Sequence, residues 1–504
     1  MSFTFWLITV LFIVGYACIA MEHPLRINKA ATALLLGVGL WTLLVIGGEK
    51  SILNPAWSHL IESSKTDGGF LDWLVHEQLV MHLGEIAEIL FFLLGAMTIV
   101  ELIDAYGGFR IITDKIHTTN RVKLLWIIIG ITFIMSPVFD NMTTTIVMVT
   151  LLRKIIANYR ERWFYASMII IAANSGGVWS PIGDVTTIML WVGGKVSEGQ
   201  LIIKTFPASV VSILVPLIIL TFRIKGNVTH PQENIFSKNA IPLVLPKESL
   251  FVLCAGLGAL IFVPVFKIVT HLPPYMGMMA GLGVLWVITE LMARKHPKRE
   301  NGKLSVLTAL TRIDTSCVLF FLGILLAVAA LQSGGHLLLL GNILEDIPLA
   351  EPEKYFAIGY TMGLLSAVVD NVPLVAGAMG MYDFEMNHYF WLFLSYCAGA
   401  GGSLLIFASA AGVAAMGLEK ITFIWYFKKI TLLSFIGYTA GALVFILQNY
   451  HSANTYAAQQ KIKNEKIMLL EENICASTFS KNPLSNYFFE KSLPEKKPED
   501  PIKD

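Results

Sequence analysis

Long apolar runs recur along this chain from one end to the other, and they constrain its fold more than any other feature. A transmembrane helix needs about 20 predominantly apolar residues. Hydrophobic residues make up 55% of the chain and charged residues only 14%, whereas soluble proteins carry about 25% charged residues. We therefore expect an all-α, multi-pass membrane protein with about ten full spans. The clear runs cover residues 5–20, 31–47, 83–103, 163–191, 208–222, 250–268, 275–291, 316–331, 389–416 and 430–447.

Several classes of function are disfavoured by composition. The first apolar run has no basic residue before it and no small-residue cleavage site after it, so we expect a retained span rather than a signal peptide. The net charge of +1 gives no reason to expect a nucleic-acid partner. The five cysteines show no disulfide or zinc spacing, and we expect no bound cofactor. The sequence contains no phosphate-binding Walker A loop, so it gives no indication that ATP drives the protein.

Two further regions, Val122–Ile156 and Tyr355–Gly380, are apolar but interrupted, and each carries an Asp-Asn pair near its middle. The string SPVFDN, which ends at Asn141, matches SAVVDN, which ends at Asn371. The apolar spans before them also match, and a glycine-rich segment follows each of them: NSGGVWSPIGD and GAGGSLLIFAS. The sequence therefore predicts an internal repeat.

Loop charges indicate that the two repeats have opposite orientations. Lys and Arg concentrate in cytoplasmic loops, and the region 122–156 begins and ends beside basic segments, whereas 355–380 begins and ends beside acidic ones. We expect two re-entrant hairpins that enter from opposite sides, each followed by a broken transmembrane helix, as in secondary transporters. The predicted segments are a first span and loop (1–30), a first repeat (31–223, hairpin 122–156, broken helix 163–191), a linker and connecting span (224–274), a second repeat (275–449, hairpin 355–380, broken helix 389–416) and a polar, disordered tail (450–504).

The polar residues of the hairpins and broken helices are of the kinds that bind small cations. Hard cations take carboxylate, amide, hydroxyl and backbone oxygens, and a carboxylate in a membrane is costly enough to require a reason. Pure helix capping is the alternative, although a neutral Ser or Thr would cap at lower cost. The candidate ligands are Asp140, Asn141, Thr143, Thr144, Thr145, Asn174, Ser175, Ser180, Asp184, Thr186, Thr187, Ser366, Asp370, Asn371, Ser403 and Ser409.

Asp184 has no acidic counterpart in the second repeat. We therefore expect one main Na⁺ site at Asp140 and Asn141, which Asp370 completes. A buried carboxylate favours its protonated form and a bound cation favours the ionised form. Competition between Na⁺ and a proton for one Asp is then sufficient for exchange.

A second acidic group precedes the first hairpin. His82, Glu85 and Glu88 lie where a span enters the membrane, and Glu101 lies near its other end. These residues are either solvated at the interface or form a proton path or pH sensor.

The longest motifs are similar to those of a known family. HLGEIAEILFFLLGAMTIVELIDAYGGF, SPVFDNMTTTIVM, NSGGVWSPIGDVTTIMLW and SAVVDNVPLVAGAMGMY resemble the NhaD-type sodium/proton antiporters of the ion transporter superfamily. The resemblance covers roughly residues 31–450. It implies two inverted repeats, a homodimer with a scaffold and a moving transport domain, and Na⁺ or Li⁺ efflux against protons for pH homeostasis, in a bacterial inner membrane. It also implies a polar set: Asp140, Asn141, Asn174, Asp184, Thr186, Thr187, Asp370 and Asn371.

Other functions remain as alternatives. A sodium-coupled anion carrier of the same fold, for citrate, a dicarboxylate or arsenite, would favour neutral hydroxyl and amide groups at the hairpin tips. An intramembrane enzyme with a catalytic Asp pair would explain neither the repeat nor the broken helices. A transporter, and not an enzyme, is therefore expected, with small cations, protons and membrane lipid as its partners.

Overall fold

The computed structural model describes residues 2–21, 25–53, 69–109, 111, 118–229, 245–294, 305–367 and 370–480. Within these ranges the chain is helical and forms no β-strand. It divides into two compact units, Met1–Gln448 and Asn449–Asp504, and the helices described below belong to the first unit unless stated. Eight helical segments in the described part are long and apolar enough to cross a membrane. The protein is therefore a multi-pass integral membrane protein, as the sequence predicts.

The eight segments differ in part from the ten predicted spans. The runs 163–191 and 389–416 are each split into two helices, and the first run forms the apolar helix Phe3–Ala20 of 18 residues, whereas Arg121–Phe139 qualifies on its own. The qualifying segments are Lys29–Gly47, Gly69–Ala105, Arg121–Phe139, Glu198–Arg223, Pro246–Thr270, Pro274–Arg294, Thr315–Ser333 and Phe423–Gln459.

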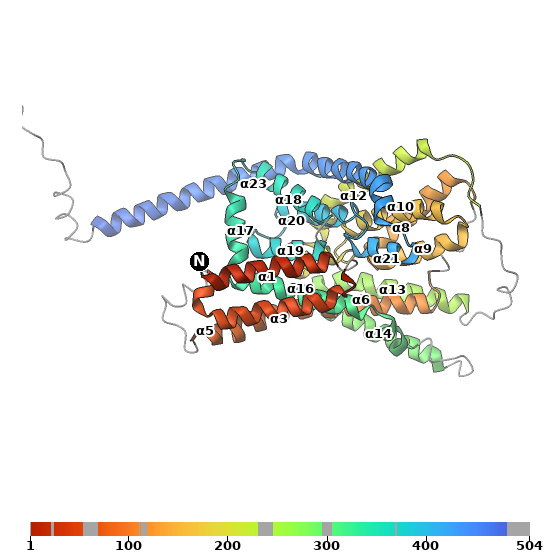
Figure 1. The fold of residues 1–504 in the computed structure, drawn as a ribbon, viewed down its shortest axis with the longest axis horizontal. Helices are drawn as coiled ribbons and strands as arrows, with labels where there is room; N and C mark the ends of the chain where they lie inside the picture. The colour runs from red at the N-terminus through yellow and green to blue at the C-terminus, as the bar shows by residue number, and fades with distance from the viewer. Residues whose placement is uncertain are drawn as a thin grey trace, which may run out of the picture. The chain divides into compact units, whose positions relative to one another are not determined.

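Six helices that lie outside the two Asp-Asn regions pack in a connected group (Figure 1). Helix α16 packs against α3 and α6, α1 covers α3, and α14 lies between α6 and α13. Helices α3 and α16 approach so closely that a Cβ on Gly323 would lie 2.5 Å from the backbone of Ala33. Small residues such as glycine permit this close approach between membrane helices. The bounds are α1 Phe3–Ala20, α3 Lys29–Gly47, α6 Val80–Ala105, α13 Pro246–Thr270, α14 Pro274–Arg294 and α16 Thr315–Ser333.

The region around the first Asp-Asn pair, residues 121–223, is called here the first polar region and forms five helices. Asn120 and Asn158 cap the starts of α8 and α10 with their side-chain oxygens. Asp140 alone separates α8 from α9, and residues 178–184 separate α10 from α11, so the predicted break in the run 163–191 is present. The helices are α8 Arg121–Phe139, α9 Asn141–Ile155, α10 Tyr159–Gly177, α11 Val185–Val192 and α12 Glu198–Arg223.

The region around the second Asp-Asn pair, residues 353–419, is the second polar region and forms four helices, in the order of α8 to α11 of the first region. A non-helical segment interrupts the run 389–416 between Gly401 and Ala410, again as predicted, and Asp370 immediately precedes α19. Residues 368–369 lie outside the described ranges. The helices are α18 Glu353–Leu365, α19 Asn371–Met381, α20 Tyr389–Gly401 and α21 Ala410–Glu419, preceded by α17 His336–Glu345.

Short helical pieces complete the described chain. A π-helical stretch, η2, leads into α6, and another, η5, leads into the last helix. These pieces are η1 Glu49–Ser51, α5 Gly69–Leu71, η2 Asp72–Leu79, α15 Val306–Arg312, α22 Phe423–Tyr426 and η5 Phe427–Thr431. The last helix, α23 Leu432–Ser480, has 49 residues and contains the boundary between the two units.

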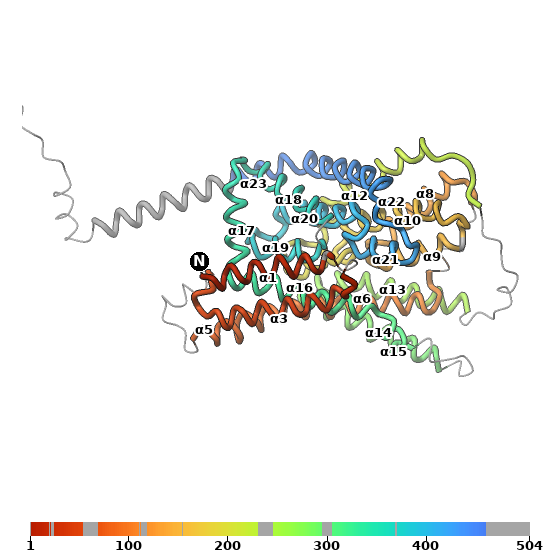
Figure 2. The backbone as a smooth tube through the Cα atoms, in the orientation of Figure 1, coloured from red at the N-terminus to blue at the C-terminus, as the bar shows by residue number. Residues whose placement is uncertain are grey.

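Helices of the two polar regions exchange contacts. Helix α9 packs on α21 (Figure 2), and α19 packs on α11. The helix that follows each Asp-Asn pair therefore lies on the short helix that follows the break in the other region. An ion-pair cluster holds one of these crossings. Glu419, at the end of α21, is 1% exposed in its side chain and accepts from Arg153 Nε at 2.7 Å and Arg162 Nε at 2.9 Å. Breaking a buried pair of this kind is costly because a buried charge is left alone.

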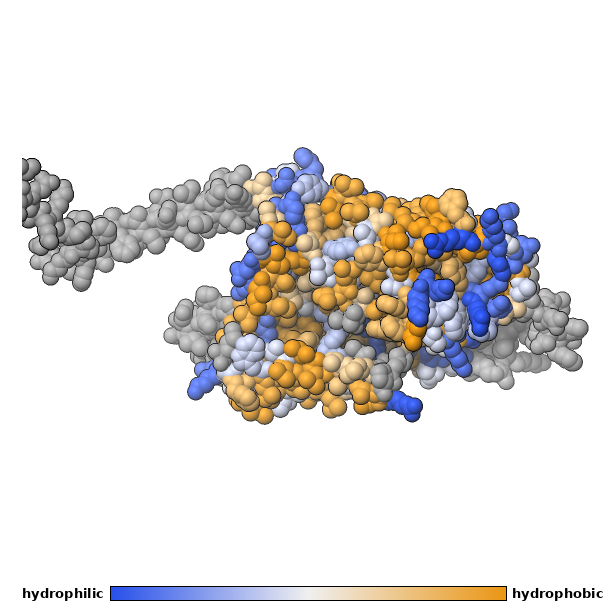
Figure 3. Space-filling view, turned by 45° about the horizontal axis from the view of Figure 1, so that its top comes forward, coloured by the Kyte–Doolittle hydropathy of each residue, from blue (hydrophilic) through white to orange (hydrophobic). Residues whose placement is uncertain are grey.

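Much of the described surface is apolar, as expected for a protein that contacts lipid. Orange, hydrophobic residues cover most of the face in Figure 3, and blue, hydrophilic ones gather toward its margins. Large apolar side chains such as Leu35, Ile46 and Phe222 are more than 70% exposed. Exposed apolar area of this extent is stable against lipid and not against water.

The predicted linker and tail are seen only in part. Residues 230–244 of the linker 224–274 lie outside the described ranges, and α13 forms its connecting span. The tail 450–504, which we expected to be disordered, begins inside α23, which continues to Ser480. This stretch contains several Ala, Lys and Glu residues, which favour a helix. Residues 481–504 lie outside the described ranges.

Candidate functional site

Asp184 is the centre of a buried polar cluster. Its side chain is the N-cap of α11, where Oδ1 accepts from the backbone N–H and the hydroxyl of Thr186, both at 2.9 Å. The other oxygen, Oδ2, accepts from Asn141 Nδ2 at 2.7 Å, and Asn371 Nδ2 lies 3.5 Å from Oδ1. The asparagines of both Asp-Asn pairs therefore point to one carboxylate, which is 1% exposed.

Asn174, in the last turn of α10, extends this cluster into the second polar region. Its Oδ1 accepts from Asn141 at 3.1 Å, and its Nδ2 donates to Ser403 and Ser409, each at 2.9 Å. The hydrogen bonds are continuous from Asn371 through Asp184, Asn141 and Asn174 to the two serines. The six side chains are all buried.

Asp140 lies beside this cluster and caps α9. Its two oxygens accept from the backbone N–H and the hydroxyl of Thr143, at 2.7 and 2.9 Å. Its backbone has φ 63° and ψ 163°, a region that costs about 1–3 kcal/mol for a residue with a side chain. Asp140, Asn141 and Thr143 line a cavity of about 50 Å³ whose other walls are apolar. Because a cavity of about 10–15 Å³ on this measure already holds one water molecule, there is room for a small ion or for a few water molecules.

Asp370 has a different environment from its counterpart. It caps α19 through the N–H of Val372 at 3.3 Å, and its Oδ2 lies 3.3 Å from Nζ of Lys29. Lys29 is not among the ligands that the sequence predicts for this site. The one signal that could have identified it is its position at the first turn of an apolar span.

Four helices begin at this cluster. The N-termini of α9, α11, α19 and α21 are capped by Asp140, Asp184, Asp370 and Ser409. The N-terminus of a helix carries partial positive charge and favours an anion. Three of the four positive ends are therefore matched by a carboxylate of the protein itself.

Close backbone contacts explain the glycines of the break. Neither Gly177 nor Gly183 adopts a positive φ. A Cβ on Gly177 would instead lie 2.4 Å from the carbonyl oxygen of Gly183. The backbone at Gly177 and the backbone at Gly183 therefore approach so closely that only glycine fits at these two positions.

Some predicted ligands are engaged elsewhere. Ser366 donates to the carbonyl of Ala398 at 2.7 Å, just as Ser136 donates to the carbonyl of Ala173 at 2.5 Å. These two matched serines tie α18 to α20 and α8 to α10. Ser175 accepts from Ser212, and Ser180 donates to the carbonyl of Pro137. Thr145 donates to the carbonyl of Asn141, and Thr187 completes the capping box of α11. The buried hydroxyl of Thr144 has no partner among the described residues.

The predicted proton-path residues form separate pairs. His82 Nδ1 lies 3.2 Å from Glu85, and Glu101 lies 3.3 Å from Arg312. Glu88 lies within electrostatic reach of Glu85 and Lys267. No described hydrogen bond connects His82, Glu85, Glu88 or Glu101 to the Asp184 cluster.

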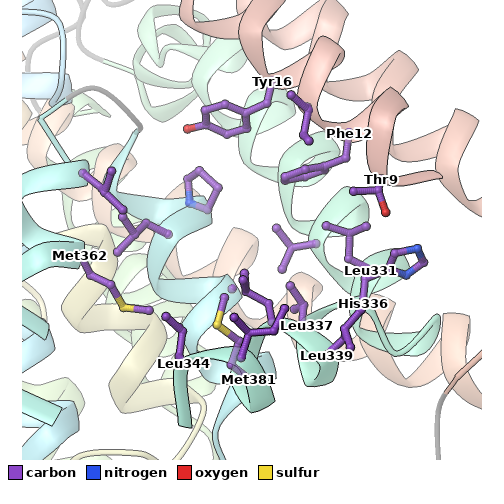
Figure 4. Close-up of a pocket in the computed structure, with 18 of the residues that line it drawn as sticks. Thr9, Phe12, Tyr16, Leu331, His336, Leu337, Leu339, Leu344, Met362 and Met381 are labelled. Carbon is purple, nitrogen blue, oxygen red and sulfur yellow. The ribbon is translucent and has the colours of Figure 1, made fainter. Parts of the chain in front are cut away.

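A larger cavity of about 770 Å³ lies among α1, α16, α17, α18 and α19 (Figure 4). Its lining is apolar apart from a few groups such as Thr9, Tyr16 and His336, and it contains no Lys, Arg, Asp or Glu. Burial lowers the pKa of His336, so this imidazole favours its neutral form. A cavity of this composition offers no charge to a small ion.

Comparison with known proteins agrees with these features. Residues 16–412 match the family model described as citrate transporter. "Sodium/proton antiporter 1" of Arabidopsis thaliana is 44% identical over 448 residues, which cover 88% of this chain and 72% of that protein. "Sodium/proton antiporter 2" of the same plant is 41% identical over 443 residues, covering 86% and 98%. "Na(+)/H(+) antiporter NhaD" of Alkalimonas amylolytica is 30% identical over 473 residues, covering 87% and 89%. The chain therefore belongs to the citrate transporter family and to the NhaD-type sodium/proton antiporters.

Proposed function

We propose that this protein exchanges Na⁺ or Li⁺ for protons across its membrane, as a secondary active transporter with alternating access. Its relatives over most of the chain are named sodium/proton antiporters. The observation that carries the proposal is the set of carboxylates at the converging helix ends, Asp140, Asp184 and Asp370. A cation can neutralise this set, and so can protons.

The cation site is proposed at Asp184 and Asp140, with oxygens from Asn141, Asn371 and Thr143. Asp184 lies within electrostatic reach of both Asp140 and Asp370, so a proton or Na⁺ at one carboxylate changes the affinity of the next. Na⁺ prefers the oxygen ligands present here. Binding of Na⁺ then displaces protons, and protonation from the other side displaces Na⁺.

The fold proposed for this exchange is a pair of inverted repeats with re-entrant hairpins at α8–α9 and α18–α19. The matched bonds of Ser136 and Ser366 support it, as do the exchanged contacts of α9 with α21 and α19 with α11. Alternating access in such folds is a rocking or sliding of one part against another around a fixed site. The homodimer remains an inference from the family resemblance.

A sodium-coupled citrate carrier is the second candidate, because the matching family model carries that description. In such a carrier the helix N-termini would be left free for the carboxylates of the substrate. Here three of the four are filled by Asp140, Asp184 and Asp370. A substrate anion would meet these charges, so the geometry favours a cation.

The remaining predictions about the protein's setting belong to the same proposal. We propose that it is a transporter and not an enzyme, with lipid, small cations and protons as partners and without a bound cofactor. The bacterial inner membrane is a prediction from the sequence alone, since the relatives at 44% and 41% identity are plant proteins. The proton path through His82, Glu85, Glu88 and Glu101 also remains a proposal.

Vesicles that contain a pH-sensitive dye test the exchange. Purified protein is reconstituted, a proton gradient is imposed, and Na⁺, Li⁺, K⁺ or Na⁺ with citrate is added. Na⁺ or Li⁺ alone should dissipate the gradient and K⁺ should not. Dissipation only when citrate is present would overturn the proposal in favour of the anion carrier.

A further inference from the structure

Lys29 brings a fixed positive charge to the edge of the candidate site. It is the first residue of α3, and its Nζ lies 3.3 Å from Asp370 Oδ2 and 4.2 Å from the centre of the Phe320 ring. The side chains of Lys29 and Asp370 are only 26% and 21% exposed. A charged pair held against an aromatic face and largely out of water is stronger than a surface pair.

The pair lies one residue from the central cluster. Asp370 is followed by Asn371, whose amide points to Asp184. Both the ion pair and the amide are therefore fixed by the start of α19. A change of charge at Asp370 acts directly on the environment of Asp184.

The matching position in the first polar region has no such partner. In the described part of the chain, no Lys or Arg forms an ion pair with Asp140 or Asp184. Asp140 instead borders the cavity of about 50 Å³. Two Asp-Asn pairs of matching sequence are thus unequal: one carboxylate holds an ammonium group, and the other faces space for an ion.

We propose that Lys29 is a tethered cation that occupies the second Asp-Asn position, so that transported Na⁺ is directed to Asp140 and Asp184. This inference rests on the proposed function. A compact ammonium on a flexible stem can occupy the position of a small cation. With Lys29 in place, three carboxylates and one ammonium leave two negative charges for exchangeable ions. Lys29 is therefore a positioning residue and does not bind the transported ion.

The alternative for Lys29 is a purely structural pair, and the two ideas predict different signs. If Lys29 compensates Asp370, then Asp370→Asn removes the negative charge that balances the Lys29 ammonium, which then repels Na⁺ and raises the apparent KM for Na⁺. Lys29→Gln leaves an extra negative charge that attracts Na⁺ and lowers the KM. A structural pair would reduce the amount of folded protein and kcat in both variants, without opposite shifts in KM.

The test is a double-mutant cycle in vesicles with Na⁺-driven proton exchange as the readout. We expect Asp370→Asn to raise the KM for Na⁺ by about tenfold or more, the effect of one charge-assisted contact. Adding Lys29→Gln to Asp370→Asn should reverse most of that rise. Lys29→Met is a second neutral variant without an amide to satisfy, and Lys29→Arg should keep the wild-type KM.

A matched control is the Lys195–Asp383 pair, whose atoms lie 3.4 Å apart and whose Asp is fully exposed. Lys195→Gln and Asp383→Asn should leave the KM for Na⁺ unchanged. Shifts of the two site variants in the same direction, or a double variant as impaired as Asp370→Asn, would overturn the role of Lys29. Wild-type protein without any Na⁺-dependent proton movement would instead overturn the proposed function, and with it this inference.

Discussion

Replacing Asp184 by Asn should abolish tight Na⁺ binding while leaving the fold intact. The change removes one negative charge and preserves the size of the side chain. One oxygen remains to accept from Thr186 and to cap α11. The new amide faces Asn141 Nδ2, which lies 2.7 Å from the atom that it replaces.

The size of the effect follows from these contacts. Loss of one charge-assisted hydrogen bond to Asn141 costs about 1.5–3 kcal/mol of stability. A carboxylate about 4 Å from a bound Na⁺ contributes about 4 kcal/mol at an effective dielectric constant of about 20. Because each 1.4 kcal/mol is a factor of ten, the affinity for Na⁺ should fall by about 100- to 1000-fold.

Calorimetric titration of Na⁺ into detergent-solubilised protein measures this loss. Size-exclusion chromatography and thermal unfolding show that the variant is folded. Asp383→Asn is the control, because it makes the same chemical change at a fully exposed carboxylate. Wild-type Na⁺ affinity in a folded Asp184→Asn protein would refute the assignment of Asp184 as the centre of the site.

Three further predictions concern structure and pH. Ser366→Ala should cost about 1 kcal/mol of stability, because it removes the bond to Ala398, and should leave the KM for Na⁺ unchanged; a tenfold rise in KM would instead make Ser366 a ligand. Gly183→Ala should destabilise by about 1–3 kcal/mol in thermal unfolding, because its Cβ would lie 2.6 Å from the carbonyl oxygen of Gly177; a variant as stable as wild type would contradict the close crossing. Burial lowers the pKa of His388, in the loop before α20, to about 4, so the folded chain binds fewer protons than the unfolded chain and loses stability as pH falls from about 6.5 to about 4, by up to about 3 kcal/mol. His388→Asn, which can still cap α20, should remove that part of the acid sensitivity in unfolding curves at pH 7 and pH 4.5, and an unchanged difference between the two curves would refute it.

The features that could be predicted from the sequence are those that depend on neighbouring residues. Membrane spans follow from apolar runs, and both helix breaks follow from glycine-rich segments that also contain polar residues. The helix caps at Asp140 and Asp370 also follow from local chemistry, and capping proves to be part of their role. The inverted orientation of the two repeats stays a prediction that rests on loop charges and matched contacts.

The features that could not be predicted depend on tertiary contacts. From the sequence we expected one main Na⁺ site at Asp140 and Asn141, completed by Asp370, because Asp184 gives the first repeat an extra carboxylate. The structure points both asparagines to Asp184 and pairs Asp370 with a lysine 341 positions away. Neither contact has a signature in the spacing of residues. Ser366 was also among the expected ligands, and its hydroxyl donates to the backbone carbonyl of Ala398.

The central claim is that Na⁺ and protons compete for the same buried carboxylates. Titration of Na⁺ in two buffers of different ionisation enthalpy, at one pH, measures the protons released as Na⁺ binds. The account predicts proton release in the wild type and its loss in Asp184→Asn. Na⁺ binding without any proton release, or binding that requires citrate, would contradict it.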